Sequence, residues 1–193
     1  MSLINEQEVI AQAQSGDSFA MKKLVEEYAP IVYKFAFQIC RSQDLAENAM
    51  QETFLSVLKN LRQFDNRSKI STWLYTIVSN HCLMHIRREK KDRFISLDDM
   101  TITADEEHFV QHGDNPHEHT ERLDTKHLLE RAIEKLEPDY RIVFALRDIE
   151  GLSTEEVAAI TNLSVPALKS RLHRARKFLR EELTPYFEEK HYG

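Results

Sequence analysis

The densest group of side chains able to do chemistry lies near the C-terminal end of the sequence. Residues 157–180 contain six Lys and Arg side chains and no acidic residue. Guanidinium and ammonium groups bind phosphate oxygens and guanine edges. A hydroxyl can hydrogen-bond to a phosphate or to a base edge. The residues that we expect to contact nucleic acid are Lys169, Ser170, Arg171, His173, Arg174 and Arg176.

A helix-turn-helix is the structure predicted around this basic face. Residues 153–156, Ser-Thr-Glu-Glu, form a capping box that begins a short helix, and Ser164 can cap a longer helix after a turn at residues 161–163. Such a helix fits the major groove with its first residues at base edges. A solvated basic face on an ordinary helical hairpin is the alternative, which the lack of acids disfavours. The inward residues are Val165, Leu168, Leu172 and Leu179.

A second polar face is expected on a long helix over residues 42–62. Positions 44, 48, 51, 52 and 55 are three or four apart, so they share one side of a helix. Carboxylates and amides there suit an Arg-rich partner helix. The face contains Asp44, Glu47, Asn48, Gln51, Glu52 and Leu55, and the predicted inner set is Leu45, Ala49, Met50, Phe54, Leu58 and Leu61.

A third group combines an aromatic loop with a basic helix end. Phe64 lies in a polar loop over residues 63–70, and a helix is predicted from residue 72 to about residue 91. Asn80 can both donate to and accept from a base edge, and Trp73 and Tyr75 are candidates for stacking, although a lone Trp at helical spacing is more often core. The expected phosphate contacts are Arg87, Arg88, Lys90 and Lys91.

The elements that must position these groups are helices. The 193 residues include only 4 Gly and 5 Pro, which disfavours folds with many tight turns, and helical apolar spacing recurs along the chain. Residues 98–124 carry nine acids and one Arg with little periodicity. We therefore predict an all-α protein: a helical domain at 1–93, a flexible acidic linker at 94–121, a helix-turn-helix domain at 122–186 and a tail at 187–193.

Several classes of function are disfavoured. No apolar run is long enough to cross a bilayer, no secretory signal is recognisable, and Cys40 and Cys82 make neither a disulfide framework nor a zinc ligand set. We expect a cytoplasmic protein without membrane insertion, with both cysteines buried. No phosphate loop or catalytic spacing is seen, so we expect neither an enzyme, nor a small-molecule substrate, nor a cofactor. Zinc or nickel binding is conceivable at His108, His112, His117 and His119, but such histidines are usually only polar, and no metal is expected.

Two long motifs resemble one protein family. The runs DLAENAMQETF at residues 44–54 and STWLYTIVSN at residues 71–80, with Phe64 between them, resemble the extracytoplasmic-function (ECF, group IV) sigma factors of bacterial RNA polymerase. The run SVPALKSRLHRARK at residues 164–177 resembles the second domain of the same group. The resemblance spans about residues 8–183, with only the linker unmatched. It implies a sigma domain two-like bundle and a sigma domain four-like helix-turn-helix.

The resemblance implies a function and partners for each face. In the family, the first domain docks on the clamp helices of the largest polymerase subunit and opens the minus-ten element, and the second sits on the flap of the other large subunit and reads the minus-thirty-five element. It assigns the 44–55 face to core polymerase and base capture to Phe64 and Asn80. It also assigns the minus-thirty-five bases to Ser170, His173 and Arg174, with backbone contacts by Lys169, Arg171 and Arg176. An anti-sigma factor is a further expected partner.

Two departures from the family pattern and one rival function remain. Asn48 replaces a usual acid, and Pro166-Ala167 replaces a frequent Gly-Thr. The acidic residues from Asp98 to Glu121 are expected to thread through a basic channel of the polymerase, or else to be a plain tether. The rival is a stand-alone helix-turn-helix regulator whose first unit dimerises or senses a ligand. The 44–54 face and the Phe64 loop are features that a simple repressor does not need.

Overall fold

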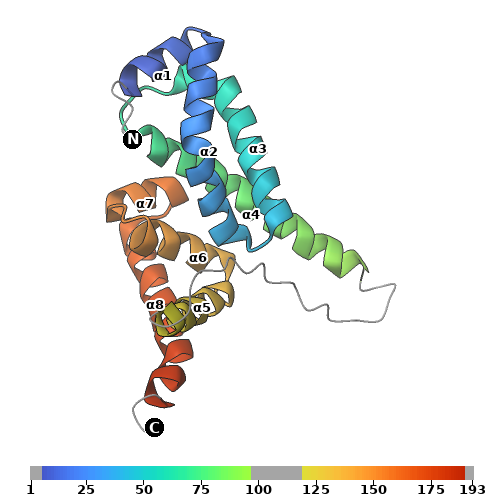
Figure 1. Cartoon of the computed structure of the whole chain (residues 1–193), viewed down its shortest axis with the longest axis vertical. Coiled ribbons are helices and arrows are strands. Elements are labelled where there is room, and N and C mark those ends of the chain that lie inside the picture. The colour runs from blue at the N-terminus through green and yellow to red at the C-terminus, as the bar shows by residue number, and fades with distance from the viewer. Residues whose placement is uncertain (1–5, 97–118, 190–193) are drawn as a thin grey trace.

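The computed structural model describes residues 6–96 and 119–189, and every regular element in those ranges is helical. Figure 1 shows α1–α4 at one end of the molecule and α5–α8 at the other, which confirms the all-α class. The first half holds α1 (Glu6–Gln14), α2 (Ser18–Cys40), α3 (Gln43–Asn60), the short 3₁₀ helix η1 (Leu61–Gln63) and α4 (Ile70–Ser96). The second holds α5 (His119–Glu134), α6 (Pro138–Phe144), the π-helical turn η2 (Ala145–Ile149), α7 (Thr154–Thr161) and α8 (Val165–Glu189).

Side-chain caps set several helix starts. The Asp17 carboxylate accepts from the backbone N–H of Phe19 at 2.8 Å and begins α2, while the Ser42 hydroxyl caps α3. The helix α2 continues through Pro30. The missing N–H costs a helical hydrogen bond. The apolar residues on both sides of Pro30, such as Leu24 and Phe35, are fully buried and keep the helix together.

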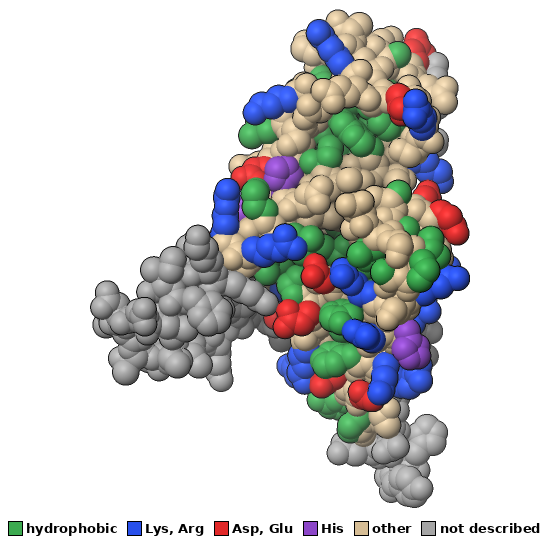
Figure 2. Space-filling model, turned by 180° about the vertical axis from the view of Figure 1, so that it is seen from behind, with side chains coloured by type: hydrophobic (Ala, Val, Ile, Leu, Met, Phe, Trp, Pro, Cys, Tyr) green, Lys and Arg blue, Asp and Glu red, His purple; other side chains and the backbone are tan. Residues whose placement is uncertain are grey.

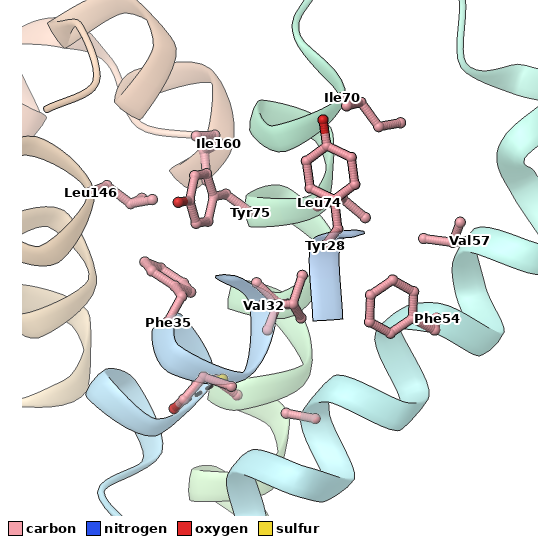
Figure 3. Close-up of a cluster of buried hydrophobic side chains, with 14 of the residues drawn as sticks. Tyr28, Val32, Phe35, Phe54, Val57, Ile70, Leu74, Tyr75, Leu146 and Ile160 are labelled. Carbon is pink, nitrogen blue, oxygen red and sulfur yellow. Dashed lines mark hydrogen bonds between the residues drawn. The ribbon is translucent and has the colours of Figure 1, made fainter. Parts of the chain in front are cut away.

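The two halves share a core, which the prediction of two domains on a flexible linker did not include. Tyr75 of α4 lies between Phe35 of α2 on one side and Leu146 and Ile160 of the second half on the other (Figure 3). These residues belong to one continuous cluster that runs from α1 to the start of α8. A smaller cluster joins α5 to α8 through Ala132, Ile133, Leu136, Ala175 and Leu179.

The helices also reach into the segment predicted as linker. α4 continues to Ser96 and α5 begins at His119, whereas the sequence pattern placed the linker at residues 94–121. Cys40 and Cys82 are buried and free, as expected. None of the described helices combines the length and apolarity needed to cross a membrane.

The shared core predicts a large stability effect at a residue that joins the halves. Leu146 is fully buried, so Leu146→Ala should lower the free energy of unfolding by about 2–5 kcal/mol, through lost burial and the cavity left behind. Urea denaturation followed by circular dichroism measures this loss. Leu129→Ala, at a partly exposed position on α5, is the matched control and should cost much less. Equal losses would mean that Leu146 is not part of a packed interface.

Candidate nucleic-acid interface and helical docking face

The helix-turn-helix is built as the sequence predicted. The Ser153 hydroxyl accepts from the Glu156 N–H at 3.1 Å, and the Glu156 carboxylate accepts from the Ser153 N–H at 2.8 Å. These hydrogen bonds hold the pKa of Glu156 below its ordinary value. Asn162 ends α7 in the left-handed conformation, and Ser164 caps the following helix through the Ala167 N–H. The local chemistry therefore sets the angle at which α8 leaves the turn.

The outer face of α8 carries the predicted DNA contacts. Leu168, Leu172 and Leu179 are buried, and Val165 packs partly against the core. The predicted residues Lys169, Ser170, His173, Arg174 and Arg176 are exposed, and Arg171 is half-buried. Seen from behind, Lys and Arg side chains gather over the lower half of the molecule, with acidic ones among them (Figure 2). The face is thus accessible and largely basic.

One predicted phosphate contact already has an internal partner. The Arg176 guanidinium binds the Asp148 carboxylate in a bidentate pair, with Nε–Oδ2 at 2.9 Å and Nη2–Oδ1 at 2.6 Å. The hydrogen bond to Asp148 raises the pKa of Arg176. Sequence reasoning missed this pair because the residues are 28 positions apart. A phosphate that contacts Arg176 must compete with Asp148.

The predicted docking face forms along the outside of α3. Asp44, Asn48, Gln51 and Leu55 are exposed, while Glu47 and Glu52 are half-buried. The Glu47 carboxylate accepts from the Gln43 side chain at 2.9 Å.

The assignment of Leu58 to the inner face of this helix was wrong. Its side chain is 54% exposed, as is that of Leu55 one turn earlier, because Phe54 and Val57 take the core positions. The docking face therefore ends in two exposed leucines. Their three-residue spacing was the available signal.

The Phe64 ring does not offer a stacking face in this structure. It is 6% exposed and packs against Trp73 with ring centroids 5.3 Å apart. The Gln14 amide donates to the Leu61 and Phe64 carbonyls at 2.9 and 2.7 Å and pins the loop. Asn80 lies seven residues after Trp73, so it shares that face of α4 about 10 Å farther along the axis. The loop and Asn80 thus border one face, but the ring is part of the core.

The rest of the predicted minus-ten surface divides into exposed and undescribed residues. Asn80, Arg87 and Arg88 are exposed on α4. Lys90 and Lys91 belong to the same helix, but their side chains lie outside the described residues. The expectations for the acidic segment from Asp98 to Glu121, and for its four histidines, also fall outside the described side chains.

Stacking of Tyr75 on a base is contradicted, because the ring is buried between the halves. Its hydroxyl donates to the Glu150 carboxylate at 2.6 Å, a contact between α4 and the segment before α7. Burial, and then this hydrogen bond, raises the pKa of the phenol. The contact holds α4, the helix proposed to take part in opening the minus-ten element, against the helix-turn-helix half.

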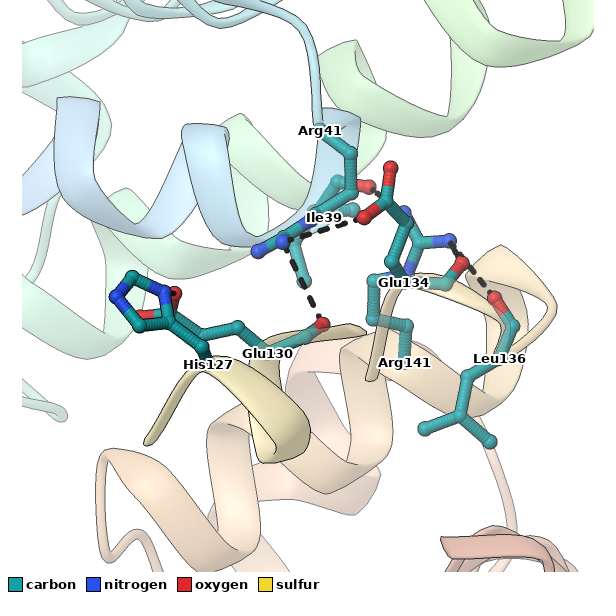
Figure 4. Close-up of polar contacts among 7 residues, drawn as sticks. All are labelled: Ile39, Arg41, His127, Glu130, Glu134, Leu136 and Arg141. Atoms are coloured by element: carbon teal, nitrogen blue, oxygen red, sulfur yellow. Dashed lines mark hydrogen bonds and ion pairs between the residues drawn. The ribbon is translucent and has the colours of Figure 1, made fainter. Parts of the chain in front are cut away.

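A buried guanidinium makes a second connection between the halves (Figure 4). Arg141 of α6 is 7% exposed and donates to the Ile39 carbonyl of α2 at 2.6 Å. It also donates to the carbonyls of Glu134 and Leu136 at 2.6 and 2.8 Å. Burial, followed by the charge of Arg41, lowers the pKa of Arg141 to about 10, so it stays charged at neutral pH.

Arg41 reinforces this connection from the other side. It ends α2 in the left-handed conformation, and its side chain reaches the Glu130 carbonyl at 3.4 Å and the Glu134 carboxylate at 3.6 Å. Sequence reasoning missed Arg41 and Arg141. The one available signal was an Arg inside the apolar run of residues 140–146.

Comparisons with known proteins place both halves in characterised groups. Residues 24–92 match the Sigma-70 region 2 family and residues 126–179 match the Sigma-70, region 4 family. The ECF RNA polymerase sigma factor SigW of Bacillus subtilis is 31% identical over 179 residues, covering 90% of this chain and 94% of that protein. SigE of Mycolicibacterium smegmatis, another ECF RNA polymerase sigma factor, is 32% identical over 180 residues, covering 91% and 67%.

A solved structure has a similar fold. The sigma factor RpoE of Bartonella quintana, crystallised with the anti-sigma factor NepR, is 26% identical and superposes with a TM-score of 0.65. The match covers 84% of this chain and 96% of that one.

The Arg141 contacts predict that this residue supports folding strongly. Arg141→Ala leaves three carbonyls, two of them in buried contacts, without their donor and should lower the free energy of unfolding by about 3 kcal/mol or more. Urea denaturation measures the change. Arg141→Lys keeps the charge but cannot reach three carbonyls at once. Its free energy of unfolding should lie between those of the wild type and the Ala variant. A loss below about 1 kcal/mol for the Ala variant would contradict the role described.

Proposed function

The chain belongs to the ECF sigma factors of bacterial RNA polymerase, and from that membership we propose how its surfaces take part in initiation. As a sigma factor it binds core polymerase and promoter DNA and directs transcription initiation at specific promoters. We assign it to group IV of the sigma factors, with functional units at residues 1–93 and 122–186. Its place of action is the cytoplasm, where the polymerase works, and we propose no catalytic role for the chain itself.

Polymerase docking is proposed for the outer face of α3. The observation that supports it is one continuous exposed stripe in which carboxylate and amide groups are followed by Leu55 and Leu58. Acidic and amide groups suit basic side chains on the clamp helices, and exposed leucines supply apolar area that a partner can cover. Neither leucine is buried in the core, so both are available for a partner to cover.

Promoter contacts are proposed for α8 and α4. Ser170, His173 and Arg174 lie exposed near the start of α8, where a recognition helix meets base edges. Asn80 is proposed to read a minus-ten base, with Arg87 and Arg88 on phosphates. Because the Phe64 ring is buried, we propose that its loop contributes shape and backbone groups to base capture, while the ring fixes the loop on Trp73.

The two halves have to separate on the promoter. The minus-ten and minus-thirty-five elements lie about 25 base pairs apart, which is about 85 Å at 3.4 Å per base pair. In the described chain, Tyr75 of α4 shares a core with Leu146 and Ile160 of the second half. A single body of this kind cannot span the two elements. We propose that the Tyr75–Glu150 contact breaks when the holoenzyme forms, and that the acidic segment then follows a basic channel of the polymerase.

An anti-sigma partner is part of the proposal. The sigma factor from Bartonella quintana was solved with an anti-sigma factor and has a similar fold over most of both chains. We propose that a comparable protein restrains this chain and covers its docking and DNA-binding faces.

Truncation of the α3 face tests polymerase docking. The double variant Gln51→Ala/Leu55→Ala should weaken binding to core polymerase about tenfold or more, since both side chains are exposed and would be buried by the partner. Competition against a fluorescently labelled wild-type chain measures the affinity. Phe19→Ala, which removes another exposed apolar side chain at the start of α2, should bind normally. Unchanged affinity of the double variant would refute the assigned face.

Substitution in α8 tests promoter reading. Arg174→Ala should weaken holoenzyme binding to a cognate promoter by about 1–3 kcal/mol and relax base preference within the minus-thirty-five element. Run-off transcription from promoters substituted at each position of that element measures the preference. Arg180→Ala, an exposed basic position farther along α8, should leave the preference unchanged. If the wild-type chain gives core polymerase no choice of start site, the proposed function itself fails.

A further inference from the structure

Three side chains from two helices meet at one carboxylate oxygen. Glu52 Oε2 of α3 lies 2.9 Å from His81 Nδ1 and 3.1 Å from His85 Nε2, both on α4. The side chains are 36%, 21% and 12% exposed, in that order. Ser56 Oγ of α3 lies 3.1 Å from His81 Nε2. Glu52 therefore links α3, the proposed docking helix, to α4, the helix proposed to open the minus-ten element.

Helical spacing explains why these four side chains come together. Glu52 and Ser56 are four residues apart on α3, as His81 and His85 are on α4, so each pair presents two side chains on one face. For both rings to donate to Glu52, His81 carries its proton on Nδ1 and His85 on Nε2. His81 Nε2 then accepts from the Ser56 hydroxyl. This assignment follows from the hydrogen-bond network.

The second oxygen of Glu52 is left for a partner. Within the described residues, no hydrogen bond or ion pair engages Oε1, and Glu52 lies beside Gln51 on the proposed docking face. A polymerase cation can bind Oε1 while Oε2 keeps both imidazole contacts. The same carboxylate then touches the polymerase and α4 at once.

We propose that His81 and His85 are positioning residues that couple polymerase docking to promoter opening. Through Glu52 they fix the orientation of α4 relative to the docked face of α3. The residues that this orients are adjacent: exposed Asn80 directly precedes His81, and exposed Arg87 and Arg88 follow His85 within one turn. The inference rests on the proposed function, because it takes α3 as the docking helix and α4 as the melting helix.

We expect the fold to persist without this network. The two helices are held together by a fully buried set around it: Thr53, Val57, Val78 and Cys82. Partly exposed ion pairs generally add little to stability. Loss of the network should therefore change function more than stability.

A swap of isosteric amides tests the inference. An Asn amide places a donor near the position of Nδ1 of His, and a Gln amide places one near Nε2. His81→Asn/His85→Gln should therefore keep both donors to Glu52, whereas His81→Gln/His85→Asn should misplace them. The two variants have the same composition and charge, so each controls for the other.

The measurement separates docking from opening. With core polymerase saturated by each variant, permanganate reactivity of minus-ten thymines reports strand opening. The His81→Gln/His85→Asn variant should open the promoter about five- to tenfold less than wild type. The His81→Asn/His85→Gln variant should stay close to wild type. Affinity for core polymerase should change by less than about twofold in both, because the rest of the α3 face is intact.

Three outcomes would contradict the inference or the proposed function on which it rests. Equal opening by the two swapped variants overturns the inference. So does the same loss in Val57→Ala, a core variant of the same helix pair that leaves the network intact, since a purely structural role would produce it. Failure of the wild-type chain to bind core polymerase or open DNA would instead refute the proposed function, and it would be evident before the variants are compared.

Discussion

The arrangement of the two halves depends on the hydrogen bonds that the buried guanidinium of Arg141 donates to backbone carbonyls. Its acceptors include the Ile39 carbonyl near the end of α2 and the Glu134 carbonyl at the end of α5. The last carbonyls of a helix have no partner within that helix, so one charged side chain satisfies two helix ends. Because Arg141 belongs to α6, its position sets where the following helix-turn-helix lies relative to α2. Burial of a charge without these acceptors would be strongly unfavourable.

The faces proposed to bind polymerase and DNA are largely independent of that core. The exposed residues of α3 and α8 project outward while the opposite faces of the same helices fill the interior. Two proposed contacts are exceptions, because Arg176 is held by Asp148 and Glu52 by two histidines. In both cases a charged group that is proposed to bind a partner already has an internal partner. Binding energy at these positions is then a difference between two sets of contacts, which favours specificity over raw affinity.

The proposed separation of the two halves on the promoter has a free-energy cost. Separation of the halves exposes Tyr75, Leu146 and Ile160 to water and breaks the Tyr75–Glu150 hydrogen bond. Core polymerase has to bind the separated form more tightly than the compact one by at least that free energy. On the proposal made above, the free chain is compact, with α4 and α7 in contact, and large partner surfaces replace the contact between the halves in the holoenzyme.

Local chemistry in the sequence was enough to predict the helices, the capping box at Ser153 and the outward set on α8, because caps and helical periodicity act over a few residues. The motifs at residues 44–54 and 164–177 were also enough to indicate the family. The burial of Phe64 and Tyr75, the exposure of Leu58 and the partners of Arg141 were decided only by tertiary structure. Two of these depend on residues far away in the chain: Tyr75 on Glu150 and Arg141 on Ile39. A periodic pattern shows which side of a helix is apolar, but not which distant segment will cover it.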